Sequence, residues 1–201
     1  MNLDFASVWE TVADLVPEND ALICGEDIVS WKDYDLRSSK IAAALSSKGL
    51  GPNSKAGLYL NNSNEYLIGQ NAIFKIGGVP INVNYRYVEE ELIYLLDNSD
   101  AEAVFYHACY SSRINEIAKS LPNVKVWIEV PDESKSNFDQ GMNYEEILTE
   151  IREIEKNSGN NKICVCVIGI GRIGLPTALS FANSGLTTIG LDINSKLVEN
   201  V

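Results

Sequence analysis

Histidine and cysteine, which supply many of the metal ligands and nucleophiles of enzymes, are scarce in this sequence. It contains one histidine, His107, and four cysteines, Cys24, Cys109, Cys164 and Cys166. The spacing of these residues matches no zinc site and no disulfide framework. His107 also has no serine or cysteine at a spacing that indicates a catalytic pair, so we predict no catalysis by this residue. Reduced thiols in a cytoplasmic protein are the simplest interpretation.

Long hydrophobic runs are absent as well. The longest uninterrupted apolar stretch lies around 163–170, which is too short to cross a membrane. The N-terminal residues MNLDFASVWE include acidic side chains and no basic ones, whereas a signal peptide begins with a basic region. With 45% hydrophobic residues and a mean hydropathy of −0.06, the chain has the composition of a soluble globular protein. We therefore expect a cytoplasmic protein of one or two domains without membrane insertion.

Basic residues are few, and charge is distributed unevenly along the chain. Residues 1–156 contain 26 acidic and 13 basic side chains, a net charge of −13, whereas residues 157–201 carry a net charge of +1. The acidic balance of the complete sequence, −12, disfavours binding to nucleic acid and to anionic membranes. The change of composition favours a junction between two segments of different origin.

Helical and strand patterns alternate along residues 1–156. Two short strands on either side of Gly25 predict a hairpin, and the apolar spacing after it predicts helices that alternate with buried strands. The expected strands are 21–24, 28–31, 55–60, 79–83, 103–106 and 124–130, and the expected helices have apolar faces at 34–45, 66–74, 88–96, 114–121 and 144–151. This alternation predicts an α/β fold with a largely parallel sheet that helices cover.

Three polar clusters lie at the ends of predicted strands and helices. Residues 61–64, Asn-Asn-Ser-Asn, are interpreted as helix caps, with Asn62 or Ser63 capping the next helix. The three consecutive glutamates 89–91 favour a solvated helix face over a metal site, because adjacent helical residues point in different directions. The run 85–87, Tyr-Arg-Tyr, could stack on a base, but a strand-to-helix turn with half-buried aromatic rings is the preferred interpretation.

Two segments carry a resemblance to a known family. They are GLYLNNSNEYL, residues 57–67, and KIGGVPINVNYRYVEEELIYLL, residues 75–96, followed by the strand at 103–106. The sequence around them is similar to the N-terminus of AMP-forming acyl-CoA synthetases, and the second segment resembles fatty-acyl-CoA ligases. The similarity runs through about Glu150. It implies the start of a ligase fold whose enzymes join a carboxylate to ATP as an acyl-adenylate and then form a CoA thioester, in fatty acid metabolism.

The catalytic parts that this resemblance implies do not follow in the sequence. The phosphate loop of the family is a Ser/Thr/Gly-rich run ending in Pro-Lys-Gly, expected shortly after the helix at 144–151. Residues 151–171 instead read IREIEKNSGNNKICVCVIGIG, in which 157–161 has the composition of a linker. The later ribose-binding acid, hinge and adenylation lysine of the family are also missing from the 201 residues. We therefore expect no catalytic residue of the ligase here.

The last part of the sequence contains the pattern of a dinucleotide-binding βαβ unit. A buried-strand run, 163–168, precedes glycines with the spacing G-x-G-x-x-G, and an apolar helix pattern and a second strand follow. Gly169 permits the tight turn, Gly171 the close approach of a pyrophosphate, and Gly174 the packing of helix on strand. The helix N-terminus would hold the phosphates, and the Asp192 carboxylate would accept hydrogen bonds from a ribose diol, which favours NAD over NADP.

This stretch carries a second resemblance. VIGIGRIGLPTALSFANSGLTTIGLDIN, residues 167–194, resembles the N-terminus of nucleotide-sugar dehydrogenases, the UDP-glucose and UDP-N-acetylhexosamine 6-dehydrogenases. Its most specific parts are the Gly-Leu-Pro that begins at the third glycine, residues 174–176, and the Asp-Ile-Asn at 192–194. The resemblance implies the start of an NAD-dependent oxidoreductase, with Arg172 and Ile173 in the cofactor loop. The catalytic cysteine and lysine of that family would lie beyond Val201.

Together these patterns predict an α/β chain in three parts. Residues 1–156 are the incomplete N-terminal domain of an acyl-CoA ligase (adenylate-forming) fold, 157–161 a linker, and 162–201 a single truncated Rossmann βαβ unit with weak NAD affinity. Such a chimeric or truncated chain has no complete active site of either parent, and it could arise by gene fusion and truncation or by an assembly join. Two alternatives stay open: a non-catalytic NAD-binding module, and a dehydrogenase fragment that a separate chain completes. No metal-binding residue is predicted.

Overall fold

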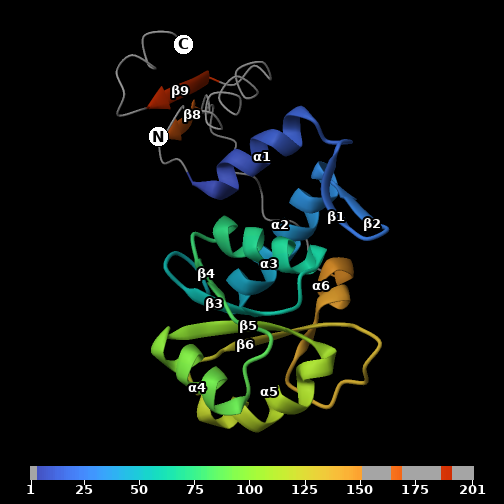
Figure 1. The fold of residues 1–201 in the computed structure, drawn as a ribbon, viewed down its shortest axis with the longest axis vertical. Coiled ribbons are helices and arrows are strands. Elements are labelled where there is room, and N and C mark those ends of the chain that lie inside the picture. Colours follow the sequence, from blue (N-terminus) through green and yellow to red (C-terminus); the bar gives the residue numbers. More distant parts are fainter. Residues whose placement is uncertain (1–3, 151–163, 169–186, 192–201) are drawn as a thin grey trace. The chain divides into compact units, whose positions relative to one another are not determined.

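The computed structural model describes residues 4–150, 164–168 and 187–191, which are drawn in colour in Figure 1. The chain divides into two compact units. The larger unit is Val12–Glu155, and the smaller unit combines Met1–Thr11 with Lys156–Val201. Each unit is described by itself.

The larger unit is built around a five-stranded sheet (Figure 1). Its strand order is β4-β3-β5-β6-β7, and all neighbouring pairs run parallel. The strands are β3 (Lys55–Tyr59), β4 (Val79–Asn82), β5 (Ala101–His107), β6 (Val126–Val130) and β7 (Met142–Asn143). The predicted parallel sheet of an α/β fold is therefore confirmed.

Helices cover both faces of this sheet, as parallel sheets require (Figure 1). On one face α2 (Trp31–Ser47) packs against α3 (Asn64–Lys75) and α6 (Tyr144–Glu150). On the other face α4 (Glu89–Asn98) packs against α5 (Ser111–Ile117). Each helical layer buries one face of the strands, so the side chains of a strand alternate between two apolar layers.

Side-chain caps fix where two of these helices begin. The Ser30 hydroxyl accepts a hydrogen bond from the Asp33 backbone N–H at 3.1 Å at the start of α2. At the start of α3, the Ser63 hydroxyl accepts from the Tyr66 N–H at 3.3 Å, so Ser63 is the cap of the two residues that the sequence offered, Asn62 and Ser63. Gly77, with φ of +70°, ends the same helix in a left-handed conformation that favours glycine.

The two apolar layers form the core on either side of the sheet. The layer beneath α4 and α5 includes Tyr59, Leu92, Leu96, Val104 and Ile114, all with at most 1% exposure. The layer beneath α2 and α3 includes Ile41, Leu58, Ile68, Ile73 and Phe105, which are fully buried. Burying one such side chain contributes about 1.5–3 kcal/mol relative to leaving it exposed.

The remaining elements are a hairpin, one N-terminal helix and several very short segments. The predicted hairpin is confirmed as β1 (Asp20–Cys24) and β2 (Asp27–Ser30), which pair antiparallel on either side of Gly25, whose φ is +63°. The sequence patterns did not predict α1 (Phe5–Leu15), β7, or the two short 3₁₀ helices Ala108–Tyr110 and Ala118–Ser120. Two or three residues are too few to show a periodic pattern. Over the residues that the structure describes, no helix has the length and apolar character needed to cross a bilayer.

The smaller unit contains the two strands predicted for the βαβ pattern. β8 (Cys164–Ile168) and β9 (Thr187–Leu191) pair in parallel, with Ile168 opposite Leu191. The residues predicted to hold NAD lie outside the described residues, and these are Gly169, Gly171, Arg172, Ile173, Gly174 and Asp192. The predicted linker 157–161 lies outside them too, so the domain boundary and the cofactor site both stay predictions.

Candidate functional site

Between β3 and β5, the connecting helices switch from one face of the sheet to the other, and the carboxyl ends of these two strands lie at this switch point. The chain leaves β3 through α3 on one face to reach β4, and it leaves β4 through α4 on the opposite face to reach β5 (Figure 1). β3 and β5 are neighbours in the sheet, and the helices that follow them, α3 and α5, lie on opposite faces. In open α/β sheets, ligands bind in the crevice at the carboxyl ends of such strands.

A hydrogen bond joins the two strands at this crevice. The backbone N–H of Asn61, just after β3, donates to Nδ1 of His107 at the end of β5, at 3.2 Å. Because Nδ1 accepts, the neutral imidazole carries its proton on Nε2. The Tyr110 hydroxyl donates to Oδ1 of Asn61 at 2.9 Å. The sequence had suggested that Asn61 is a helix cap, and this interpretation is wrong. Its side chain instead links the end of β3 to the residues after β5.

His107 is held as a neutral ring. It is 7% exposed, and burial lowers its pKa below the ordinary value of 6.5, against the opposing charges of Asp132 and Glu65. Its Nε2 makes no hydrogen bond to the residues that the structure describes. A buried neutral imidazole at this position can donate one hydrogen bond and cannot act as a cation at neutral pH.

Beside this pair, Arg113 organises a second polar cluster. Its Nη1 donates to the Tyr59 hydroxyl at 2.6 Å and to the Tyr87 carbonyl at 3.1 Å, and its Nε donates to Oε1 of Glu89 at 2.9 Å. The Tyr59 hydroxyl in turn donates to the Tyr87 carbonyl at 2.9 Å. Burial raises the pKa of Tyr59, and the hydrogen bond to Tyr59 raises the pKa of Arg113. The hydrogen bonds of the guanidinium therefore hold the loop between β4 and α4 in place.

Cys109 lies two residues after His107 at this edge of the sheet, and its chemistry is not that of a nucleophile. Partial burial raises the pKa of its thiol to about 11, and the neighbouring Asp132 carboxylate adds to the effect. Burial alone would raise the pKa of Asp132, but hydrogen bonds from the Cys109 and Ser134 amides lower it below its ordinary value. The thiol is therefore protonated at neutral pH and unreactive.

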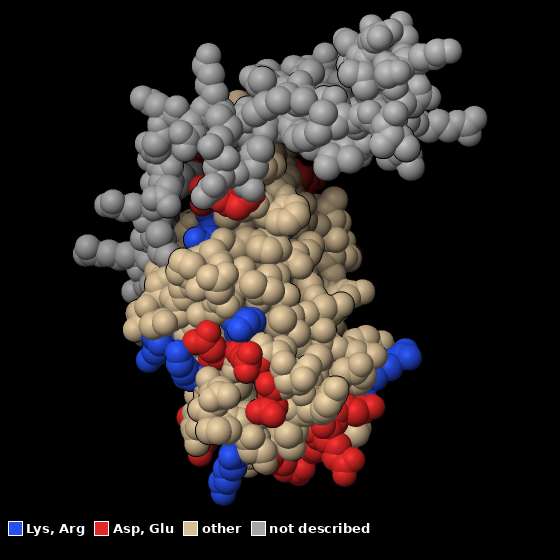
Figure 2. Space-filling model, turned by 90° about the vertical axis from the view of Figure 1, so that its left-hand side faces the viewer, with Lys and Arg blue, Asp and Glu red and all other residues tan. Residues whose placement is uncertain are grey.

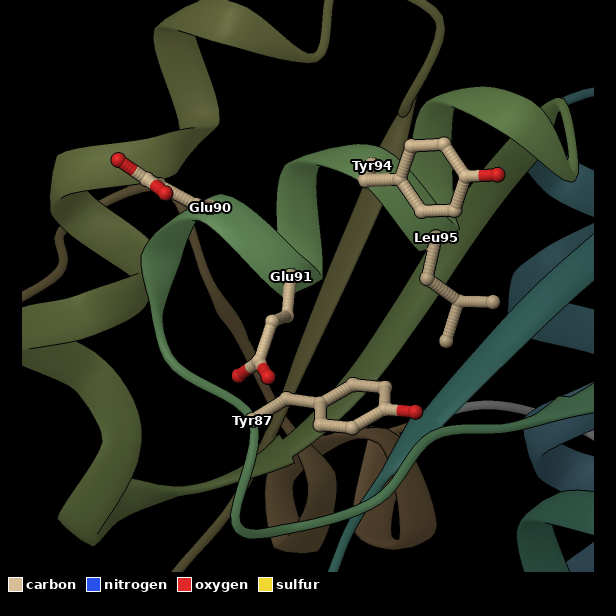
Figure 3. Close-up of a pocket in the computed structure, with 5 residues that line it drawn as sticks. All are labelled: Tyr87, Glu90, Glu91, Tyr94 and Leu95. Atoms are coloured by element: carbon tan, nitrogen blue, oxygen red, sulfur yellow. The ribbon is translucent and has the colours of Figure 1, made fainter.

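A pocket of about 320 Å³ lies next to the Arg113 cluster, on the outer side of α4 (Figure 3). Its lining residues are Tyr87, Glu90, Glu91, Tyr94 and Leu95. The volume falls at the lower end of the range of small-molecule sites. Tyr87 belongs to both places, because its ring lines the pocket while its carbonyl accepts from Arg113 and Tyr59.

Acidic residues outnumber basic ones on α4 and α5. Figure 2 shows red carboxylates gathered toward the end of the larger unit that these helices form in Figure 1. Among the described residues, no group of three histidine, cysteine, aspartate or glutamate side chains could hold a metal ion. The three glutamates 89–91 separate in the way expected for adjacent helical residues, because Glu89 pairs with Arg113 while Oε2 of Glu91 accepts from the Val88 N–H.

The sequence did not reveal these clusters. Asn61 and His107 are 46 residues apart, and Tyr59 and Arg113 are 54 apart, so no local spacing links them. These clusters could have been predicted only from the order of the strands, because polar residues at the carboxyl ends of two neighbouring parallel strands meet at one edge of the sheet. The predicted strand-to-helix turn at 85–87 is confirmed before α4, but the role of Tyr87 in both the cluster and the pocket depends on tertiary packing.

Comparison with known proteins agrees with the fold. The sequence model of the family described as AMP-binding enzyme matches residues 9–166. The chain therefore belongs to the AMP-binding enzyme family, and its ancestry is that of the acyl-CoA ligases. The match extends to Cys166, past the end predicted for this segment at 156, and it stops before the glycine pattern.

Two curated relatives are CoA ligases. The chain is 38% identical over 136 residues to a medium/long-chain-fatty-acid–CoA/3-oxocholest-4-en-26-oate–CoA ligase of Mycobacterium marinum, covering 68% of this chain and 25% of the relative. It is 36% identical over 166 residues to a 3-oxocholest-4-en-26-oate–CoA ligase of Rhodococcus rhodochrous, covering 80% of this chain and 30% of the relative. The chain thus spans 25% to 30% of the length of these relatives.

Solved structures share the fold. The N-terminal domain of FACL13 from Mycobacterium tuberculosis matches with a TM-score of 0.66 at 15% identity, over 94% of this chain and 57% of that one. Acetoacetyl-CoA synthetase from Streptomyces lividans matches with a TM-score of 0.69 at 17% identity, over 75% of this chain and 26% of that one. At these identities the likeness establishes the architecture of adenylate-forming ligases alone.

Proposed function

We propose that the larger unit is the N-terminal scaffold of an AMP-forming carboxylate–CoA ligase, and that this 201-residue chain has no ligase activity of its own. The observation that carries the proposal is the family match over residues 9–166, which covers the sheet and both helical layers but no phosphate loop. By the names of its relatives, the acid would be a medium- or long-chain fatty acid or a sterol-derived carboxylate.

The reason for inactivity lies in the chemistry of the first step. Attack of a carboxylate on the α-phosphate of ATP forms an acyl–AMP anhydride and releases pyrophosphate, so negative charge builds on phosphate oxygens. Positioned amides and cations that stabilise this charge supply most of the rate enhancement in such reactions. The only described guanidinium in the polar cluster, Arg113, is already bound to Tyr59, Tyr87 and Glu89.

Thioester formation tests this proposal. We expect the purified chain, supplied with ATP, Mg²⁺, CoA and a fatty acid or a 3-oxosteroid carboxylic acid, to give no acyl-CoA above a protein-free control. Mass spectrometry of the acyl-CoA product is the measurement. Acyl-CoA that appears in proportion to the chain concentration would show that the proposal is wrong.

A second candidate function, weak NAD binding, is supported by the parallel pairing of β8 with β9. Parallel neighbours require a crossover connection, and the residues between these strands carry the glycine pattern. In this proposal Gly169, Gly171 and Gly174 accommodate the pyrophosphate and Asp192 binds a ribose. A single βαβ unit offers no second half of the crevice for the nicotinamide, so most of the contact area is missing.

Calorimetric titration tests the NAD proposal. We expect a dissociation constant in the millimolar range or weaker, because each 1.4 kcal/mol of lost contact weakens binding about tenfold. Gly171→Val should abolish the remaining binding, and Asp192→Ala should weaken it. A micromolar dissociation constant that Gly171→Val removes would instead establish an NAD-binding module, and tight binding that survives this substitution would place the nucleotide elsewhere.

A further inference from the structure

The pocket beside α4 is lined by residues that have no part in the proposed ligase function. Two tyrosines, two glutamates and one leucine line it. In Figure 3 the rings of Tyr87 and Tyr94 lie on either side of Leu95, and the Glu91 carboxylate points toward Tyr87, whereas Glu90 points outward from the helix. The pocket therefore combines aromatic faces with negative charge.

Two of its walls are fixed in place. The Tyr87 backbone is held by its N–H, which donates to the Asn84 carbonyl at 2.9 Å, and by its carbonyl, which accepts from Tyr59 and Arg113. Oε2 of Glu91 accepts from the Val88 N–H at 2.9 Å, which leaves Oε1 for another partner. A carboxylate and a ring that are ordered before binding cost less entropy when a ligand arrives.

Neither carboxylate of the pocket forms an ion pair with another residue that the structure describes. Among the described residues, the ion pairs of Lys55, Lys75, Arg113 and Lys125 involve other carboxylates, and neither Glu90 nor Glu91 takes part in one. Arg86, next to Tyr87 in the chain, places its guanidinium over the Tyr85 ring, 5.5 Å from the centroid. The Tyr94 ring, 71% exposed, is open to a cation, and the Tyr87 ring, half-buried against the core, forms another part of the pocket lining.

We propose that this pocket binds a small organic cation with an apolar body, of the quaternary ammonium class. Such a cation interacts with the faces of tyrosine rings through their negative quadrupole, and its methyl groups pack against apolar walls such as Leu95. The Glu91 carboxylate neutralises its charge, and Glu90 adds to the local negative potential. The site is separate from the β3–β5 crevice and does not depend on ligase activity.

Choline and its uncharged isostere 3,3-dimethylbutan-1-ol test the proposal with the complete chain. Both have the same shape, and only choline is charged. We expect choline, at matched ionic strength in NaCl, to shift the NMR signals of the Leu95 methyls and the Tyr94 ring with an affinity about three to ten times that of the alcohol. Equal affinities for the two compounds would overturn the proposal, as would shifts confined to other residues.

Variants that remove one ring or one charge sharpen the test. Tyr94→Leu removes a ring that is 71% exposed, and Glu91→Gln removes charge while glutamine can still accept the Val88 hydrogen bond. Each should weaken choline binding about threefold or more. The matched controls Tyr85→Leu and Glu116→Gln, which lie outside the pocket lining, should not. Choline binding that is unchanged by both pocket substitutions would contradict the proposal, and equal losses in the controls would do so too.

Discussion

His107 holds the carboxyl ends of the two central strands together through a bond that requires an unprotonated Nδ1. Its pKa is lowered in the folded chain, chiefly by burial, so the unfolded chain binds the proton at higher pH than the folded chain does. The stabilising contribution is therefore fully present above the ordinary pKa of 6.5, and it is lost as pH falls through and below that value. This imidazole is the single histidine of the sequence.

We predict that the free energy of unfolding falls between about pH 7.5 and pH 5.5, because histidine is the side chain that ordinarily titrates there. Urea unfolding at a series of pH values measures it. In His107→Gln, the amide oxygen can still accept from the Asn61 N–H but does not titrate, so the fall should largely disappear. The same pH dependence in both proteins would show that His107 is not its source.

The roles of single polar residues were the least predictable feature of the larger unit. Sequence reasoning narrowed the cap of α3 to Asn62 or Ser63, and Ser63 is the cap, because a cap depends on a neighbour three residues away. It interpreted Asn61 and Asn64 as caps as well, whereas Asn61 accepts from Tyr110 and Asn64 donates to Asp27. Those partners are brought together by the order of strands and helices, which a local pattern does not contain.

The elements themselves followed from the sequence more closely. Each strand of the main sheet except β7 was expected within a few residues of its observed bounds, since buried β-branched runs between helical periods are typical of α/β folds. The layer beneath α4 shows why one glycine is needed in β3. A Cβ on Gly57 would lie 2.8 Å from Cδ2 of Leu96, closer than side chains pack.

We predict that Gly57→Ala destabilises the chain by about 1–3 kcal/mol, because the Leu96 side chain must move within a fully buried layer to make room for the methyl group. Chemical denaturation with tryptophan fluorescence measures the change. Gly51→Ala is the matched control, since nothing lies within 4 Å of a Cβ there. We expect a change of less than about 1 kcal/mol in that variant. Equal stability of Gly57→Ala and the parent chain would mean that β3 and α4 are not packed as described.

The complete chain combines a part whose ancestry is established with a part that remains a prediction. The sequence predicted the acyl-CoA ligase resemblance through Glu150, and the family match and the shared fold confirm it. The dehydrogenase resemblance of 162–201 and its NAD site stay predictions, because the parallel pair β8 and β9 is the structure described there. One pair of parallel strands is common to many α/β proteins and does not identify a cofactor.

The most direct measurement of what this chain can do is acid-dependent exchange of labelled pyrophosphate into ATP. This assay detects the adenylation step alone, without CoA. We predict that purified chain, with Mg²⁺, ATP and a series of fatty acids and sterol-derived acids, gives exchange no faster than the sample without acid, because the phosphate loop and adenylation lysine are missing from the sequence. Reproducible exchange that requires both the acid and the chain would contradict the proposal that these residues are a ligase scaffold without catalysis.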